Sequence, residues 1–206
     1  MTTATKIDLG KLHKAEYATP RKPALLVCQP AVYLAIDGTG APGSDAFAAR
    51  IGALYGIAFT VKMTRKFAGL QDYAVGKLEA RYFFEPAQCL QQIPPEEWRW
   101  QLLIRTPDFV QPSDLAAAVT TLDKRGKGAH ANEVRLEQLD EGQCVQMLHV
   151  GPYEQEGETA AQMLAFAESK GLRYVGPHHE IYISDPRRVE PAKLKTILRL
   201  PVRPEA

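Results

Sequence analysis

Apolar residues recur at the spacing of an α-helix in three segments, at about residues 44–65, 112–125 and 155–170. The clearest stripe lies in the first segment, where steps of four and three residues alternate: Phe47, Ile51, Leu54, Ala58 and Val61. Ser44, a residue type that favours the N-cap, precedes this stripe. The pattern therefore predicts three amphipathic helices, each packing one face on a sheet.

The hydrophobic period falls to two between these helices, which is typical of half-buried strands. The predicted strands are residues 32–36, 73–84, 98–104, 133–139, 145–150, 179–184 and 195–200. Proline-rich turns separate the strands, and no long Gly/Ser linker divides the chain. Residues 1–206 are therefore expected to form one α+β domain.

The order of the predicted elements repeats weakly, in pseudo-repeats at about residues 24–110 and 132–203. Each half contains a strand, a Gly/Pro loop, a helix and two further strands, and the alignment of the halves makes Glu79 equivalent to Glu180. Duplicated strand-helix-strand-strand units predict an antiparallel sheet with helices on one face. We expect a central ligand groove where the halves meet.

Charge and cysteine content exclude several classes of protein. The 25 Lys and Arg residues balance 24 Asp and Glu residues, so nucleic acid is not an expected partner. No uncharged run of 18 residues suggests a membrane span, and the N-terminus does not resemble a secretory signal, so we expect a cytoplasmic protein. Cys28, Cys89 and Cys144 form no Cys-x-x-Cys pair and are expected to be reduced and buried.

A glycine-rich loop at residues 38–43 matches the spacing Gly-x-Gly-x-x-Gly of dinucleotide-binding loops. No Asp or Glu occurs from residue 46 to 71 to bind a ribose hydroxyl, and Pro42 removes an amide donor. The loop is better explained as a turn that ends in the Ser44 cap. No cofactor is therefore expected.

The histidines do not predict a metal site either. His178 and His179 are adjacent on a predicted strand, so their side chains should point to opposite faces and cannot both bind one ion. The chain also lacks the common hydrolase and kinase motifs.

The most informative chemical feature is an acid among aromatic residues. Glu180 and Tyr182 share one face of their strand, and Trp98 and Trp100 share one face of another. Further rings come from Tyr55, Phe59 and Phe83. The alternative is that the tryptophans belong to the core and the glutamate is solvated on an outer face.

Several sequence stretches together resemble the GyrI-like small-molecule-binding domain family. They are HEIYISDPRR (179–188) followed by PAKLKT (191–196), YLAIDGTGAP (33–42), WRW with IRTPDFV (98–100 and 104–110), and HVGPY (149–153). The resemblance covers about residues 20–203 and favours the stand-alone branch, because no helix-turn-helix precedes the domain. This branch is related to cyclopropanoid cyclopropyl hydrolases and to the effector-binding domains of multidrug-sensing transcription activators.

The resemblance implies a groove that holds flat aromatic or cationic molecules beside a central glutamate, here Glu180. It also implies hydrolytic detoxification of cyclopropane-bearing alkylating compounds, with Glu180 as general base and Tyr182 as hydrogen-bond donor. The implied ligand-binding residues are Tyr55, Phe59, Glu79, Phe83, Trp98, Trp100 and Tyr153. At residues 80–83 the chain has Ala-Arg-Tyr-Phe where the family favours Gly and Trp, so the place of Glu79 stays open.

Two functional hypotheses follow, together with a purely structural one. The first is a small-molecule-binding protein that hydrolyses electrophilic aromatic compounds. The alternative is a non-catalytic module that sequesters or senses ligands, or acts on a protein partner such as gyrase. In the structural reading there is no groove, and Glu180 would lie in bulk solvent. The sequence does not determine the oligomeric state.

Overall fold

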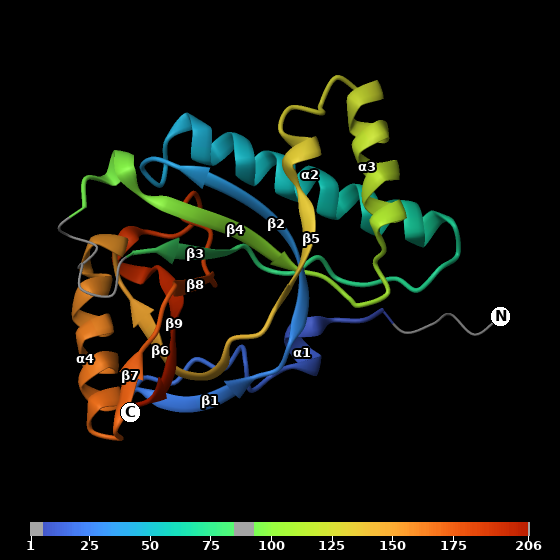
Figure 1. Ribbon diagram of the computed structural model, residues 1–206. Coiled ribbons are helices and arrows are strands. Elements are labelled where there is room, and N and C mark those ends of the chain that lie inside the picture. The colour runs from blue at the N-terminus through green and yellow to red at the C-terminus, as the bar shows by residue number, and fades with distance from the viewer. Residues whose placement is uncertain (1–5, 85–92, 206) are drawn as a thin grey trace.

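The computed structural model describes residues 6–84 and 93–205, which form an antiparallel sheet with two long helices packed on it (Figure 1). The strands are β1 (Ala24–Cys28), β2 (Ala31–Thr39), β3 (Glu79–Phe83), β4 (Arg99–Arg105), β5 (Arg135–Leu139), β6 (Gly142–Val150), β7 (Leu172–Tyr174), β8 (His178–Tyr182) and β9 (Lys195–Pro204). The helices are α1 (Leu9–Leu12), α2 (Asp45–Phe67), α3 (Pro112–Lys124) and α4 (Glu156–Glu168). The fold is therefore α+β, as predicted.

The strand order is β1-β6-β9-β8-β3-β4-β2-β5, with β7 added against β9. The segments β2-α2-β3-β4 and β6-α4-β8-β9 are the two strand-helix-strand-strand units, and they meet where β3 pairs with β8. Strand β1, which precedes the first unit in the sequence, pairs with β6 of the second unit. Strand β5, which precedes the second unit, pairs with β2 of the first unit. The sheet is thus symmetric about the β3–β8 junction.

The register at this junction corrects the predicted alignment of the halves. Ala80 lies directly opposite Glu180, and a two-fold axis through this pair exchanges Tyr82 with Tyr182. The two tyrosine hydroxyls meet at 2.9 Å, as expected for residues related in this way. The equivalence of Glu79 with Glu180 is therefore wrong by one residue, and such a shift moves a side chain to the other face of the sheet.

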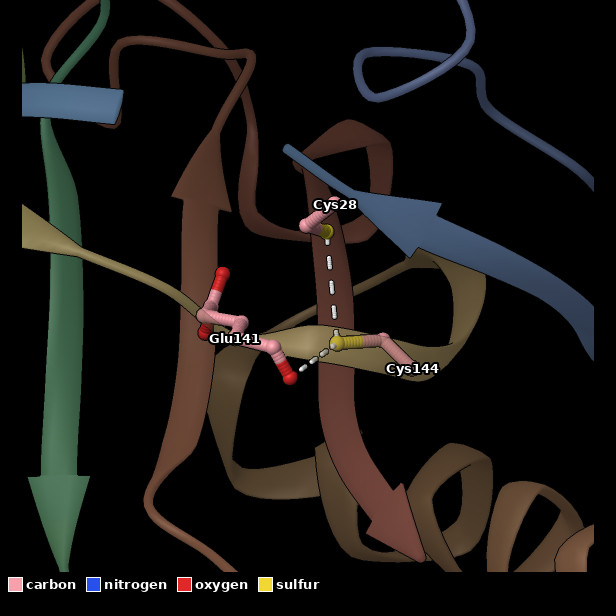
Figure 2. A group of neighbouring side chains, drawn as sticks. All are labelled: Cys28, Glu141 and Cys144. Atoms are coloured by element: carbon pink, nitrogen blue, oxygen red, sulfur yellow. Dashed lines mark hydrogen bonds between the residues drawn. The ribbon is translucent and has the colours of Figure 1, made fainter. Parts of the chain in front are cut away.

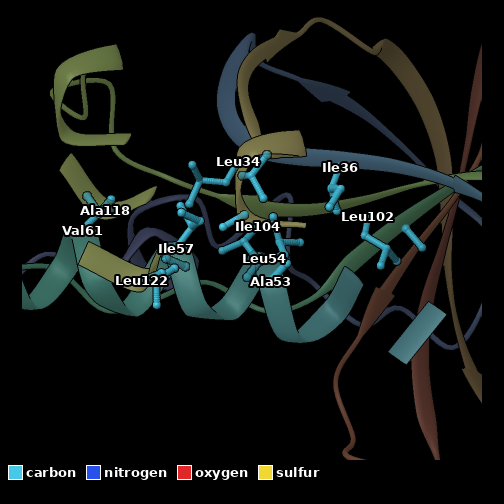
Figure 3. Close-up of a cluster of buried hydrophobic side chains, with 14 of the residues drawn as sticks. Leu34, Ile36, Ala53, Leu54, Ile57, Val61, Leu102, Ile104, Ala118 and Leu122 are labelled. Atoms are coloured by element: carbon cyan, nitrogen blue, oxygen red, sulfur yellow. The ribbon is translucent and has the colours of Figure 1, made fainter. Parts of the chain in front are cut away.

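Helix α2 forms where the apolar stripe predicts it. The side chain of Ser44 caps the helix by accepting a hydrogen bond from the Phe47 amide at 3.3 Å. The buried side of α2 packs on β2 and β4 through a cluster that includes Leu34, Ile36, Leu54, Ile57, Leu102 and Ile104 (Figure 3). Of the helices in the described ranges, α2 alone has the length and mean hydropathy to cross a membrane, and one side of it packs in this core cluster.

Helix α4 packs on the second half through Met163 and Ala167, which contact β6 and β9. Leu102 belongs to the cluster under α2, and Leu198 belongs to the cluster under α4. These two residues are joined by one row of paired residues across the sheet, in the order Leu102, Ala80, Glu180, Leu198. Paired residues in such a row share a face. The two helices therefore cover the same face, and Glu180 lies between their contact areas on that face.

Several details of the chain differ from the pattern, including helix α1, which was not predicted. The predicted strand at residues 73–84 is a strand only from Glu79 to Phe83. Residues 74–78 form no strand, and Gly76 lies so close to the end of β4 that a Cβ atom there would be 3.0 Å from the Arg105 carbonyl oxygen. Strands β1 and β7 were not predicted, because one is a short apolar run and the other has three residues.

Candidate functional site

Glu180 is the centre of the candidate site. It lies on β8, next to the junction of the two halves, and its side chain is buried, with 7% of the residue exposed. The Tyr182 hydroxyl donates a hydrogen bond to one Glu180 carboxylate oxygen at 2.8 Å. The two side chains therefore share one face, as the alternation along the strand predicted, and Glu180 is not in bulk solvent.

A second tyrosine extends this arrangement into the other half of the chain. The hydroxyls of Tyr82 and Tyr182 are 2.9 Å apart. Because the Tyr182 proton is directed at Glu180, Tyr82 is the donor in this contact. Burial, and next to it the charge of Glu180, raises the pKa of both phenols well above the ordinary value. Both hydroxyls therefore keep their protons and form a chain that ends on Glu180.

Glu156, the first residue of α4, is a site residue that the sequence analysis missed. It is buried, and burial together with the neighbouring Glu180 raises its pKa to about 10. Glu156 is therefore protonated at neutral pH. Its carboxyl group can then lie beside that of Glu180 without the repulsion that two negative charges would cause. Glu156 falls on the same helical stripe as the buried Thr159 and Met163. This spacing is the feature of the sequence from which the burial of Glu156 could have been predicted.

His178 completes a cluster with the two acids. Its Nε2 atom lies 3.2 Å from Oε1 of Glu180, but among the described residues nothing completes a hydrogen bond to Nε2 of His178 or Oε1 of Glu156. Ligand atoms of the three side chains lie within 4.8 Å of one another, so Glu156, His178 and Glu180 could hold a divalent cation.

His178 and His179 do point to opposite faces of the sheet, as predicted. The expectation of no metal stays a prediction.

Aromatic rings surround the acid cluster. Trp98 packs edge-on against Tyr82, with ring centroids 5.7 Å apart, and Phe84 stacks on Tyr82 at 6.2 Å. Tyr153, beside α4, contacts the Tyr182 ring at 5.9 Å. Burial, followed by the charges of Glu156 and Glu180, raises the pKa of Tyr153 to about 12. Of the predicted wall residues, Trp98 and Tyr153 are thus brought to the site.

The ring pair on α2 lies at a different place. Tyr55 and Phe59 stack with centroids 6.0 Å apart, and about half of Phe59 is exposed. Burial raises the pKa of Tyr55, and the charge of Asp185, in the segment that follows β8, adds to this effect. Tyr55 therefore lies near the end of β8, but no direct contact joins it to Glu180 in the described part of the structure.

Three predicted ligand residues have other positions. Trp100 is a core residue, 1% exposed, which packs on Phe47 and donates its indole N–H to the Gly40 carbonyl oxygen. Because it is covered by the protein, it cannot form a stacking wall. Glu79 and Phe83 alternate with Ala80 and Tyr82 and face away from Glu180. The sheet separates them from the acid cluster.

Glu79 instead belongs to a buried ionic network on the other face. It accepts hydrogen bonds from Tyr17 at 2.9 Å and from the His179 imidazole at 3.0 Å. The other ring nitrogen of His179 lies 2.9 Å from Glu141, which also binds Arg199 at 3.0 Å. Burial opposes the charge on His179, but Glu141 and then Glu79 raise its pKa to about 9. His179 is therefore protonated at neutral pH.

A cavity of about 260 Å³ opens beside the ring cluster. It is lined by Phe83, Phe84, Arg99 and residues 174–177. Glu180 is not among the lining residues, and of the rings packed on Tyr82 only Phe84 lines the cavity. Its volume lies below the usual range for sites of drug-sized ligands, about 300–1,000 Å³.

Comparison with known proteins identifies the family. The sequence model of the GyrI-like small molecule binding domain matches residues 106–203. The chain is 38% identical to an uncharacterized conserved protein from Listeria innocua, over 96% of this chain and 100% of that one, with a TM-score of 0.89. A hydrolase from Listeria innocua is 37% identical, over 97% and 100% of the two chains, with a TM-score of 0.87. A search of curated proteins finds no matching relative.

The C-terminal domain of EcmrR has the same fold, with a TM-score of 0.58 over 89% of this chain and 98% of that one, at 12% identity. The resemblance noted in the sequence is therefore supported by a match to the family's own sequence model and by relatives aligned over nearly the whole chain. The chain belongs to the family of GyrI-like small-molecule-binding domains.

Proposed function

We propose that this protein binds flat aromatic or cationic small molecules beside Glu180 and hydrolyses cyclopropane-bearing alkylating compounds. The observation that carries the proposal is the position of Glu180, buried between the Tyr182 phenol and the Glu156 carboxyl group at the junction of the two halves. The similarity to a Listeria innocua protein described as a hydrolase supports a hydrolytic reaction. We expect this reaction to take place in the cytoplasm.

In the proposed reaction, Glu180 takes a proton from a water molecule while the water oxygen attacks a cyclopropane carbon. The carbon–carbon bond of the ring breaks, and its electron pair moves into the conjugated dienone, whose oxygen becomes an enolate. When Glu180 takes up the proton from water it releases the Tyr182 hydroxyl, which then donates its hydrogen bond to this oxygen as negative charge develops there. The proton on Glu180 then neutralises the product, so that one water molecule is consumed.

Replacement of Glu180 tests the proposed role. The full chain is mixed with a cyclopropane-bearing alkylator, and the ring-opened product is followed by mass spectrometry above the spontaneous background. Glu180→Gln should lower turnover by about 100-fold or more. Glu158→Gln, which changes an exposed acid near the start of α4, should leave turnover unchanged. Equal turnover in wild type and Glu180→Gln would refute the assignment.

A second candidate function is ligand sequestration without chemistry. The observation that favours it is the ring cluster of Trp98, Phe84 and Tyr82 beside an acid, since cations bind both to aromatic faces and to carboxylates. Titration with a lipophilic cationic dye should quench Trp98 fluorescence at one equivalent, and Trp98→Phe identifies the signal that comes from this residue. Stoichiometric binding of the alkylator without any product would favour this alternative.

A further inference from the structure

Two cysteines from distant parts of the chain lie in contact on the sheet face opposite Glu180. Cys28 is the last residue of β1, and Cys144 lies on the neighbouring strand β6. Their sulfur atoms are 3.9 Å apart, although the residues are separated by 116 positions in the sequence (Figure 2). Both residues are buried, and neither forms a disulfide.

We propose that Cys28 and Cys144 are a modification site, at which a peroxide forms an intramolecular disulfide that joins β1 to β6. A disulfide requires the two sulfur atoms to approach to about 2.0 Å. Cys28 is suited to this movement because it is the last residue of β1 and lies diagonally across the strand pair from Cys144, whose direct partner is Leu26. A small shift of this strand end can therefore close the gap.

The chemistry uses Cys28 as the first nucleophile. The contact between the two sulfur atoms, 3.9 Å apart, lowers the pKa of Cys28, and the nearby charge of Arg199 adds to this effect, while burial opposes it. The Cys28 thiolate attacks one peroxide oxygen, which breaks the O–O bond and gives a sulfenic acid and, after protonation, one water molecule. Cys144 then attacks the Cys28 sulfur and displaces the second oxygen as water. In total, two thiols and one hydrogen peroxide give one disulfide and two water molecules.

Access to the buried thiols comes through the edge of the sheet. In the described part of the chain β1 pairs with β6 alone, so its outer edge has no hydrogen-bonded neighbour. Val27, next to Cys28, is largely exposed. Local opening of an edge strand requires less free energy than global unfolding, and hydrogen peroxide is little larger than water. Oxidation by a peroxide is therefore expected, whereas a bulky thiol reagent should react slowly with the folded protein.

The disulfide would fasten the N-terminal part of the chain to the sheet. Just before β1, the carbonyl oxygens of Glu16 and Ala18 accept hydrogen bonds from Arg199 and Gln146 at 2.6 and 2.7 Å. Cys144 lies two residues from Gln146 on β6, so the new bond would reinforce an existing attachment. Closing so long a loop restricts the unfolded chain, and we expect the melting temperature to rise by about 5–10 °C.

The test uses the full chain with Cys89, which lies outside the described residues, replaced by Ser. Hydrogen peroxide should lower the intact mass by about 2 Da, and dithiothreitol should restore it. Peptide mapping should recover a Cys28–Cys144 cross-link, and the melting temperature should rise on oxidation. The matched controls Cys28→Ser and Cys144→Ser, made in the same background, should show neither change.

Two results would overturn the proposal. One is oxidation of both thiols to sulfinic or sulfonic acids without any cross-linked peptide, which would show that the sulfur atoms do not meet. The other is a cross-link that leaves the melting temperature unchanged or lower, which would show that the disulfide distorts the native strand pair. Peptide mapping in the Cys89→Ser background needs no substitution at either reacting cysteine, so a misfolded control cannot obscure the outcome.

Discussion

Glu156 shows how burial and a like charge together fix the state of one side chain. Its ordinary pKa is near 4.5, whereas burial and Glu180 raise it to about 10 in the folded protein. The unfolded chain therefore releases this proton at a much lower pH than the folded protein does. The contribution of the protonated Glu156 to the free energy of unfolding is therefore fully present below pH 4.5, and it is lost as the pH rises towards 10.

Glu156→Gln should remove this pH-dependent loss, because glutamine resembles the protonated acid in shape and cannot ionise. We expect the variant to be more stable than wild type by on the order of 2 kcal/mol at pH 8, and equal to it at pH 4. Urea unfolding at both pH values measures the difference. Glu158→Gln, an exposed acid two residues along α4, is the matched control and should be neutral at both. A variant less stable than wild type at pH 8 would contradict the protonated state.

At the scale of elements, the β2–β4 pair depends on the absence of a side chain at Gly38. Gly38 lies opposite Trp100, and a Cβ atom there would be 2.1 Å from the indole ring. Because Trp100 is also held by Phe47 and by the Gly40 carbonyl oxygen, the ring cannot move aside without breaking core contacts. The Trp100 that the sequence assigned to a ligand wall is thus a packing residue beneath the glycine-rich loop.

Gly38→Ala should therefore lower the free energy of unfolding by about 3 kcal/mol, from overpacking. Gly52→Ala is the matched substitution, since Gly52 lies on the exposed side of α2 with no atom within 4 Å of its Cβ position. This change should raise stability by about 0.5–1 kcal/mol through helix propensity. Equal effects of the two substitutions in chemical denaturation would contradict the close packing at Gly38.

The same elements show what the sequence could and could not predict. The helices follow from local information, since their apolar stripes and the Ser44 cap lie within the segments themselves. The site depends on which residues face each other across β3 and β8, and pairing between distant strands leaves no local signal. A shift of one residue in the assumed alignment was enough to make Glu79, rather than Ala80, the equivalent of Glu180.

For the whole molecule, the network around His179 joins parts of the chain that are far apart in the sequence. Glu79 comes from the first half, Glu141 and Arg199 come from the second, and Tyr17 belongs to the N-terminal segment. The side chains of both His179 and Glu79 are fully buried. Removing one partner of a buried ion pair leaves an uncompensated charge, so His179→Gln should cost about 3–5 kcal/mol at pH 6.

The pH dependence separates this ionic role from simple packing. The folded pKa of His179, about 9, exceeds the ordinary value of 6.5, so its contribution is fully present below pH 6.5 and is lost as the pH rises through 9. Because Glu156 also titrates in this range, the comparison is made between Glu156→Gln and the double variant Glu156→Gln/His179→Gln. Their difference in unfolding free energy should shrink by about 3 kcal/mol between pH 6 and pH 9.5, measured by denaturant titration. A difference that stays constant would mean that the imidazole stabilises the junction of the two halves as a neutral ring, without a charge shared with Glu141 and Glu79.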